Sequence, residues 1–334
     1  MVKYLLRRIV MMLVVLIGIT FIVFFVTNLL PANPARVAAG PSASNEEVAM
    51  IAEKMGLNKP LPIRYLIYLG DLLHLDMGKS ILSKQPVLKE VSARIAATLE
   101  LTLAATTVYI IVSLSLGIYC ARHPGWIDSL TRMFCVGSSA IPPYWLALLL
   151  QLVFYYYLGL LPSGGRLPAN LSPPEAVTGL YILDSILAGN WETLKHALIH
   201  LVLPTVSLAL GNIGLTTRVV RTQVTQEMSQ DYVRTAKAKG LTDKVAVRRH
   251  AVKNAMNPIV TTIGIQTGYM MVGTIMIETI FRWPGLGSYA ITSIQNLDFP
   301  AITGIAIVMA LSFSVINLLV DLIYMLLNPR VRLT

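Results

Sequence analysis

Charged residues are scarce in this sequence. Only 13% of the 334 residues are Asp, Glu, Lys or Arg, and 55% are hydrophobic. A soluble domain carries about 25% charged residues, because charge covers the surface that faces water. The composition therefore excludes an ordinary soluble protein and predicts that most of the apolar surface faces lipid.

Cysteine and histidine are also rare. The two cysteines, Cys120 and Cys135, are too few for a disulfide framework, and we interpret them as small residues packed at helix ends. Among the 5 histidines, only His196 and His200 have the i, i+4 spacing at which two side chains could share a metal. We interpret this pair as the polar end of a helix at the outer interface, and we predict no metal site.

A complete nucleotide-binding loop is missing as well. Gly78-Lys79-Ser80 is a fragment of the phosphate-cradling motif, but Leu73 stands where the first glycine of that motif should be. We therefore predict no catalytic residues and no cofactor bound by this chain.

Long apolar runs, by contrast, recur along the chain. A helix that crosses a bilayer core of about 30 Å needs roughly 20 apolar residues. Six stretches approach or exceed that length, at residues 9–30, 98–120, 133–158, 197–217, 258–280 and 300–327. We expect kinks at Pro142, Pro143 and Pro204, because a proline removes a helical hydrogen bond. The predicted fold is an all-α integral membrane protein with six transmembrane helices.

The first apolar run has the basic flank of a secretory signal, with Lys3, Arg7 and Arg8 before it. It is longer than a signal's apolar core of roughly 7 to 15 residues, and no small-residue cleavage site closes it directly. We interpret the run as a retained first helix.

Basic residues concentrate on one side of the predicted membrane. With six alternating spans, the segments on the side of the N-terminus hold 16 basic and 5 acidic residues, and the opposite segments hold 11 basic and 12 acidic residues. Cytoplasmic segments are enriched in Lys and Arg. Both termini are therefore predicted to be cytoplasmic. The same distribution accounts for the net charge of +10, so we predict no nucleic-acid partner.

The chain divides into three predicted parts. Residues 1–30 form the cytoplasmic N-terminus and first span, residues 31–97 an external subdomain, and residues 98–334 a core of five helices. The external subdomain contains a predicted helix at residues 44–55, which begins with capping and acidic residues and ends at a glycine. A second outer segment, residues 161–195, is predicted to be a loop with a short interfacial helix.

The most basic segment, at about residues 218–257, joins the fourth and fifth spans and holds 9 of the 27 basic residues. Gly240 suits the left-handed position that ends a helix, and Thr242 with Asp243 suits the cap that begins the next. The pattern predicts a helix, a glycine turn and a second helix against the inner membrane face. It fits two roles, which are anchoring on anionic lipid headgroups and fitting the groove of another protein.

Polar residues recur on the fifth predicted span. Thr262, Gln266, Tyr269 and Thr274 follow one another at spacings of 4, 3 and 5 residues. Polar groups at membrane depth face protein or water, because lipid offers them no hydrogen bond. The stripe fits the lining of a translocation path, and it also fits hydrogen bonding between helices without contact to a solute.

One run of the basic segment is distinctive. It reads Asp-Tyr-Val-Arg-Thr-Ala-Lys-Ala-Lys-Gly at residues 231–240 and is followed by Arg249, His250, Ala251, Lys253, Asn254, Ala255 and Pro258. These residues resemble the permease subunits of binding-protein-dependent ABC importers, specifically the dipeptide, oligopeptide and nickel branch. The superfamily's usual Glu and final Leu-Pro are missing here, and the Tyr-Val-Arg-Thr-Ala run is typical of the peptide branch. Further matches cover nearly the whole chain, among them Leu5, Pro204, Glu278, Trp283, Pro300 and Asp321.

This resemblance implies a multi-pass permease of the type I ABC importer class in a bacterial or archaeal plasma membrane. The implied partners are a second, similar permease in a heterodimer, two ATP-binding subunits that hold ATP and Mg, and an external solute-binding protein. The residues it places in contact with an ATP-binding subunit are Tyr232, Arg234, Thr235, Ala236, Lys237, Ala238, Gly240 and Leu241. The implied solutes are di- and oligopeptides, with nickel or a metal chelate as the alternative.

Overall fold

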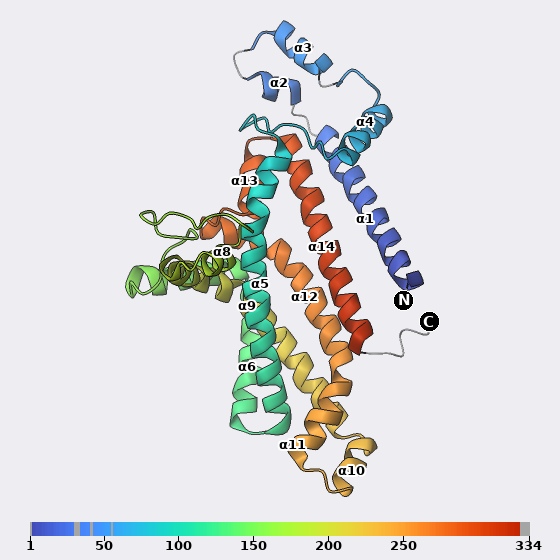
Figure 1. Cartoon of the computed structure of the whole chain (residues 1–334), viewed down its shortest axis with the longest axis vertical. Coiled ribbons are helices and arrows are strands. Elements are labelled where there is room, and N and C mark those ends of the chain that lie inside the picture. The colour runs from blue at the N-terminus through green and yellow to red at the C-terminus, as the bar shows by residue number, and fades with distance from the viewer. Residues whose placement is uncertain (1, 30–33, 41–42, 55, 328–334) are drawn as a thin grey trace. The chain divides into compact units, whose positions relative to one another are not determined.

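The computed structural model describes residues 2–29, 34–40, 43–54 and 56–327, and Figure 1 shows them as helices joined by loops. No strand forms in this described part, where the one pairing of the sheet type is an isolated bridge between Lys79 and Pro86. The all-α prediction is therefore confirmed. Two compact units make up the chain, Met1–Ala97 with Pro284–Ser314 as unit 1, and Thr98–Trp283 with Val315–Thr334 as unit 2. The three-part division at residues 30 and 97 stays a prediction.

Unit 1 combines the first part of the chain with a later segment. Its helices are α1 (Val2–Leu29), α2 (Pro34–Ala39), α3 (Asn45–Lys54), α4 (Leu61–Leu73), the start of α5 (Val87–Arg122), α13 (Leu286–Gln295) and the first half of α14 (Phe299–Leu327). Helices α1 and α14 coincide with the first and sixth predicted spans.

Helix α3 confirms the helix predicted at residues 44–55. Its start is a capping box, because the Glu47 backbone N–H donates to Ser44 Oγ at 3.2 Å and the Ser44 N–H donates to the Glu47 carboxylate at 2.7 Å. Its end is a left-handed glycine, Gly56, with φ of 65°. The next N–H, of Leu57, donates to the Ala52 carbonyl at 2.9 Å, which closes the helix in a Schellman motif.

A small apolar core joins the start of α5 to α13 and α14 within unit 1. Val87, Leu286 and Ala301 are fully buried in it. Beside this core, the carboxylate of Asp298 accepts a hydrogen bond from the Ser80 hydroxyl, and both residues are 1% exposed. The bond holds the loop before α5 against the start of α14.

Unit 2 contains the remaining long helices. They are the rest of α5, α6 (Trp126–Ala140), α7 (Pro143–Leu150), the π-helical η1 (Gln151–Tyr157), α8 (Tyr181–Leu187), α9 (Trp191–Met228), α10 (Asp231–Ala238), α11 (Asp243–Ala246), the π-helical η2 (Val247–Ala251), α12 (Val252–Ile280) and the second half of α14. Helix α8 is the short helix predicted in the outer segment 161–195.

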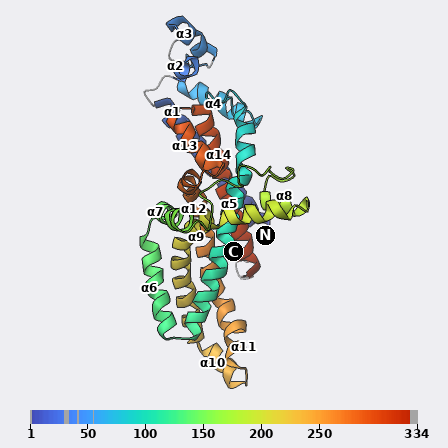
Figure 2. The ribbon, with the colours of Figure 1, turned by 90° about the vertical axis from the view of Figure 1, so that its left-hand side faces the viewer.

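The third predicted span is broken into two helical segments. Segments Trp126–Ala140 and Pro143–Tyr157 meet at an angle of 103°, and Figure 2 shows α7 turned across the direction of α6. Ile141 and Pro142 are extended between them, because a proline lacks a backbone N–H and disfavours helical geometry in the residue before it. The predicted kink at Pro142 and Pro143 is thus confirmed as a full break.

The number of spans follows from this break. Within the described residues, five helices are long and apolar enough to cross a membrane, and the bent pair raises the number to six if it counts as one span. The prediction of six is confirmed on that basis, while the side on which the termini lie stays a prediction.

Helix α9 contacts α6, α7, α8 and α12, and two glycines allow neighbouring helices to approach closely. A Cβ added to Gly214 would lie 2.1 Å from the Ser138 hydroxyl and 2.9 Å from the Cys135 carbonyl oxygen, and one added to Gly117 would lie 2.6 Å from the Val220 side chain. Cys135 lies within α6 rather than at a helix end, and its backbone faces Gly214 at this crossing.

Candidate functional site

The basic segment between α9 and α12 folds as the sequence predicts. Helix α10 is followed by Gly240, whose φ is +90°, and then by α11. The Leu241 N–H donates to the Ala236 carbonyl at 3.3 Å and the Gly240 N–H donates to the Lys237 carbonyl at 3.0 Å. These bonds satisfy carbonyls that the helix end leaves open, and only glycine adopts the required φ without strain.

The predicted cap at the start of α11 is only partly confirmed. Thr242 occupies the N-cap position with extended geometry, but its side chain makes no capping hydrogen bond. The Asp243 carboxylate instead accepts from the Lys237 ammonium at 2.6 Å. This pair links the end of α10 to the start of α11 across the glycine turn.

One face of α10 is buried against the long helices. Val233 is fully buried and Ala236 is 8% exposed. Val233 belongs to a cluster that includes Val220 and Val224 of α9 and Ile259 of α12, and Leu241 packs against its edge. A displacement of α10 therefore acts directly on α9 and α12, because close-packed side chains transmit strain.

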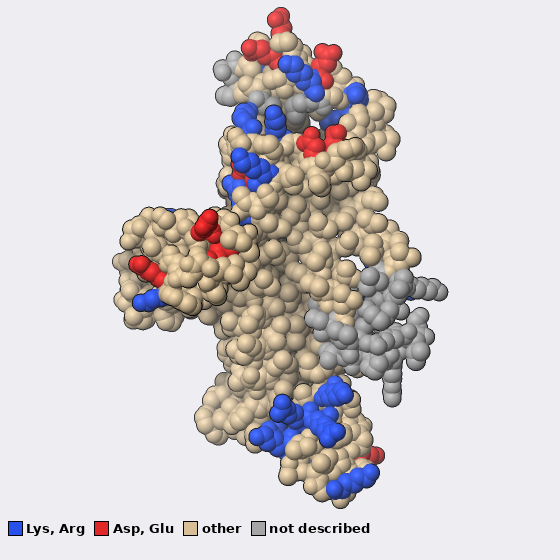
Figure 3. All heavy atoms as spheres, viewed as in Figure 1, with Lys and Arg blue, Asp and Glu red and all other residues tan. Residues whose placement is uncertain are grey.

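The opposite face of α10 is open. Thr235, Ala238 and Gly240 are exposed, the Arg234 side chain is 76% exposed, and Lys237 is 42% exposed. Figure 3 shows the Lys and Arg side chains gathered over this end of the molecule. An open groove of about 580 Å³ beside them is lined by Lys244, Val245, Arg248, Arg249 and Lys253.

Tyr232 stands at the start of this surface, 38% exposed, and its hydroxyl donates to the Glu227 carboxylate. Partial burial raises the pKa of the Tyr232 phenol, and the bond to Glu227 raises it further. The phenol therefore stays protonated and holds α10 to the end of α9. Of the eight residues predicted to contact an ATP-binding subunit, Ala236 is buried, Leu241 is partly buried, and the other six form an exposed face.

The polar stripe on α12 is less uniform than its spacing predicts. Gln266 Nε2 donates to the Asn212 side chain of α9 at 2.9 Å, and Tyr269 is 66% exposed. Thr262 is partly buried and donates to the Pro258 carbonyl at 2.9 Å. Thr274 is fully buried, and at 3.6 residues per turn it lies about 120° around the helix from Thr262.

Two buried ion pairs are not predicted from the sequence. Asp128 of α6, 2% exposed, accepts two hydrogen bonds from the Arg221 guanidinium of α9. Glu100 of α5 accepts from Arg166 of the outer loop at 2.6 Å, and both are at most 7% exposed. The partners stand 93 and 66 residues apart in the chain, so no local pattern could pair them.

The buried Arg166 organises the outer loop. Its guanidinium carbon lies 3.4 Å from the centre of the Tyr181 ring, and its Nη2 donates to the Gly179 carbonyl at 2.9 Å. His200 fastens the same loop, since its Nδ1 lies 3.0 Å from the Gly164 carbonyl oxygen. In the described part of the chain no group of three or more His, Cys, Asp or Glu side chains could hold a metal ion.

Glu278 of α12 is fully buried and accepts a hydrogen bond from Thr98 of α5 at 2.7 Å. The bond satisfies part of the hydrogen-bonding capacity of a carboxylate at membrane depth, where an unpaired polar group costs free energy. Glu278 thus contributes to packing within unit 2.

Several apolar helices and a folded basic loop between two of them define a multi-pass membrane protein. The family described as the binding-protein-dependent transport system inner membrane component matches residues 113–333, and the N-terminal part of such membrane components matches residues 1–102. The chain belongs to this family, so it is a transporter subunit of the plasma membrane.

Curated relatives extend over the same length. A probable D,D-dipeptide transport system permease protein of Escherichia coli is 40% identical over 96% of this chain and 94% of its own. A dipeptide transport system permease protein of Alkalihalophilus pseudofirmus is 37% identical over 99% of this chain and 100% of its own. A glutathione transport system permease protein of Salmonella typhimurium is 32% identical over 99% of both chains.

Proposed function

We propose that the chain is one of two permease subunits that together form the translocation path of an ATP-driven importer of di- and oligopeptides. An external solute-binding protein delivers the peptide, and two ATP-binding subunits drive its passage. The observation that carries the peptide assignment is the 40% and 37% identity to dipeptide permeases over nearly the full chain. None of the relatives described above carries a name that points to nickel, the alternative solute.

The exposed face of α10 is the docking surface for an ATP-binding subunit. Arg234, Thr235, Lys237 and Ala238 present charge and small side chains there, while Val233 is buried against the long helices. A partner that moves α10 moves α9 and α12 with it. This is the rigid-body coupling that an alternating-access transporter needs.

ATP and Mg²⁺ belong to the partner subunits in this proposal. The fragment of a phosphate-binding loop in this chain supports that division, because the Ser80 hydroxyl is buried and donates to Asp298. In a working phosphate loop this hydroxyl would contact the magnesium ion.

The translocation path includes the face of α12 that carries Thr262, Gln266 and Tyr269. Tyr269 is the most exposed of these residues, and the Gln266 bond to Asn212 orients a polar pair between α12 and α9. Thr274 is fully buried and contributes to packing within unit 2 instead.

The function is tested by copurification of the chain with its partner subunits in mild detergent, followed by ATPase assays in proteoliposomes. Stimulation by a peptide-loaded solute-binding protein supports the proposal. Stimulation only by a nickel-loaded binding protein transfers the assignment to metal import, and a stable complex without any ATPase contradicts the importer function.

A further inference from the structure

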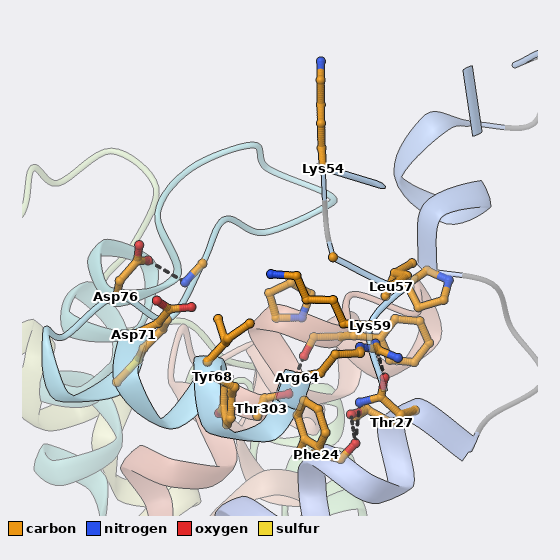
Figure 4. A pocket seen from close by; sticks show the side chains of 18 residues that line it. Phe24, Thr27, Lys54, Leu57, Lys59, Arg64, Tyr68, Asp71, Asp76 and Thr303 are labelled. Atoms are coloured by element: carbon orange, nitrogen blue, oxygen red, sulfur yellow. Dashed lines mark hydrogen bonds between the residues drawn. The ribbon is translucent and has the colours of Figure 1, made fainter. Parts of the chain in front are cut away.

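A cavity of about 420 Å³ lies within unit 1, well separated in sequence from the basic loop. The end of α1, the turn after α3, helix α4 and the start of α14 line it, as Figure 4 shows. Its size is that of a site for a small molecule or a headgroup.

The polar groups of the cavity share one face of α4. Arg64, Tyr68 and Asp71 follow one another at i, i+4 and i+7, which places them in a row along the helix. Lys59 joins Arg64 at one end of the row, and Asp76 joins Asp71 at the other, as Figure 4 shows. The cavity therefore has a cationic end and an anionic end.

These groups have capacity for a ligand. Arg64, Lys59 and Asp71 form no ion pair in the described part of the chain, and the Arg64 guanidinium donates a hydrogen bond to the Asn28 side chain. The Tyr68 hydroxyl is buried and has no hydrogen-bond partner among the described residues. Burial raises the pKa of Tyr68, so its phenol stays a donor, and burial lowers the pKa of Arg64, which marks a guanidinium partly removed from water.

The cavity lies at the end of a membrane-spanning helix. The apolar run of α1 extends over Leu6–Asn28, and Arg64 bonds to Asn28, the last residue of that run. The Tyr68 ring stacks on the Phe24 ring, and the Tyr65 ring contacts Phe24 at a tilt of 53°. Phe24 stands four residues before Asn28, which is about 6 Å inside the end of the run at 1.5 Å per residue. Helix α4 therefore lies at the depth where headgroups meet acyl chains.

Ile63 and Leu66 of α4 lie on the side of the helix opposite Tyr68 and the cavity, and they are 48% and 66% exposed. At this depth an exposed apolar face contacts acyl chains, as in a helix that lies in the membrane interface.

We propose that this cavity binds the headgroup of a zwitterionic phospholipid that carries a free ammonium, such as phosphatidylethanolamine. Arg64 and Lys59 hold the phosphate, the Tyr68 hydroxyl donates to a phosphate oxygen, and Asp71 accepts from the ammonium. Arginine pairs well with phosphate because its planar donors match two oxygens at once. The bound lipid holds α4 against α1, and it thereby holds the predicted external subdomain, residues 31–97, at the membrane surface.

The experiment is native mass spectrometry of the complete transporter released from nanodiscs of equal phosphatidylethanolamine and phosphatidylglycerol. Arg64→Gln and Lys59→Gln test the phosphate end, and Lys89→Gln, an exposed lysine outside the cavity, is the matched control. Because Arg64 also bonds to Asn28, size-exclusion profiles check folding, and Lys59→Gln provides a variant without that contact.

We expect retained phosphatidylethanolamine on the wild type and on Lys89→Gln, with a loss of roughly tenfold on Arg64→Gln and Lys59→Gln, the effect of one charge-assisted bond. Asp71→Asn should shift retention toward phosphatidylglycerol. Equal retention by all variants would overturn the proposal, as would preference of the wild type for phosphatidylglycerol. Displacement of the lipid by free inorganic phosphate would assign the site to a soluble anion instead.

Discussion

Replacement of Gly240 separates the mechanical role of the basic loop from its folding. With φ at +90°, the position favours glycine, tolerates asparagine and resists a β-branched side chain. No atom lies within 4 Å of a Cβ added there, so any cost comes from the backbone and not from a clash. The strain is on the order of 1 kcal/mol for Gly240→Ala and about 2 to 3 kcal/mol for Gly240→Val.

Such strain disfavours the native form of the loop, in which Gly240 makes the turn between α10 and α11. At 1.4 kcal/mol per factor of ten, Gly240→Val should lower the population of that form roughly 30- to 140-fold, and Gly240→Asn should lower it little. The buried cluster around Val233 and Val220 is untouched, so we expect thermal unfolding to stay near that of the wild type.

The assay compares peptide uptake with peptide-stimulated ATPase activity in proteoliposomes. We expect uptake to fall in the order wild type, Asn, Ala, Val, with the protein still folded. Wild-type uptake by Gly240→Val would refute the reasoning, and so would an Asn variant as impaired as the Val variant.

Three further predictions concern the scaffold. Gly214→Ala should destabilise the protein by about 1 to 3 kcal/mol, because its Cβ would meet Ser138 at 2.1 Å, whereas Gly137→Ala, with open space around it, should be neutral or slightly stabilising in thermal unfolding. Arg221→Met should cost about 1 to 3 kcal/mol, because it leaves the Asp128 carboxylate, 2% exposed, with Arg132 at 3.6 Å as its remaining partner. Asp128→Ala in the same chain should restore much of the loss in the same measurement. Burial alone would raise the pKa of Asp184, but hydrogen bonds from Thr178 and Gly179 lower it below 3.8. The ionised Asp184 therefore stabilises the outer loop fully at a pH above the ordinary pKa of aspartate, and this stabilisation is lost as the pH falls through the lower pKa of the folded protein. We expect proteolysis of the outer loop to become faster at acid pH. Asp184→Asn should show fast proteolysis already at pH 7, without further dependence on acid.

The sequence predicts the local features of this fold well. The apolar runs locate the long helices, and capping and acidic residues predict the start of α3, where Ser44 and Glu47 form a capping box. Gly240 likewise predicts the turn that divides the basic loop. These features depend on neighbours in the chain, so their signals are local.

Contacts between residues that lie far apart in the chain leave no local pattern and cannot be predicted in this way. Arg166 and Glu100 meet across 66 residues, and Asp128 and Arg221 across 93. The spacing of Thr274 predicts a polar stripe, yet the packing of α12 buries this residue completely. Gln266 donates to Asn212 of α9, and only the tertiary structure brings these two side chains together.

The most direct test of the central claim is cross-linking from the exposed face of α10 in the assembled transporter. Ala238→Cys is exposed, and both native cysteines are buried, so a thiol-directed photo-cross-linker can be attached selectively. Ser83→Cys, an exposed position in the predicted external subdomain, is the control. We predict a cross-link to the ATP-binding subunit from Ala238→Cys and none from Ser83→Cys. No cross-link from Ala238→Cys, or labelling of that position from outside intact cells, would contradict the assignment of this loop.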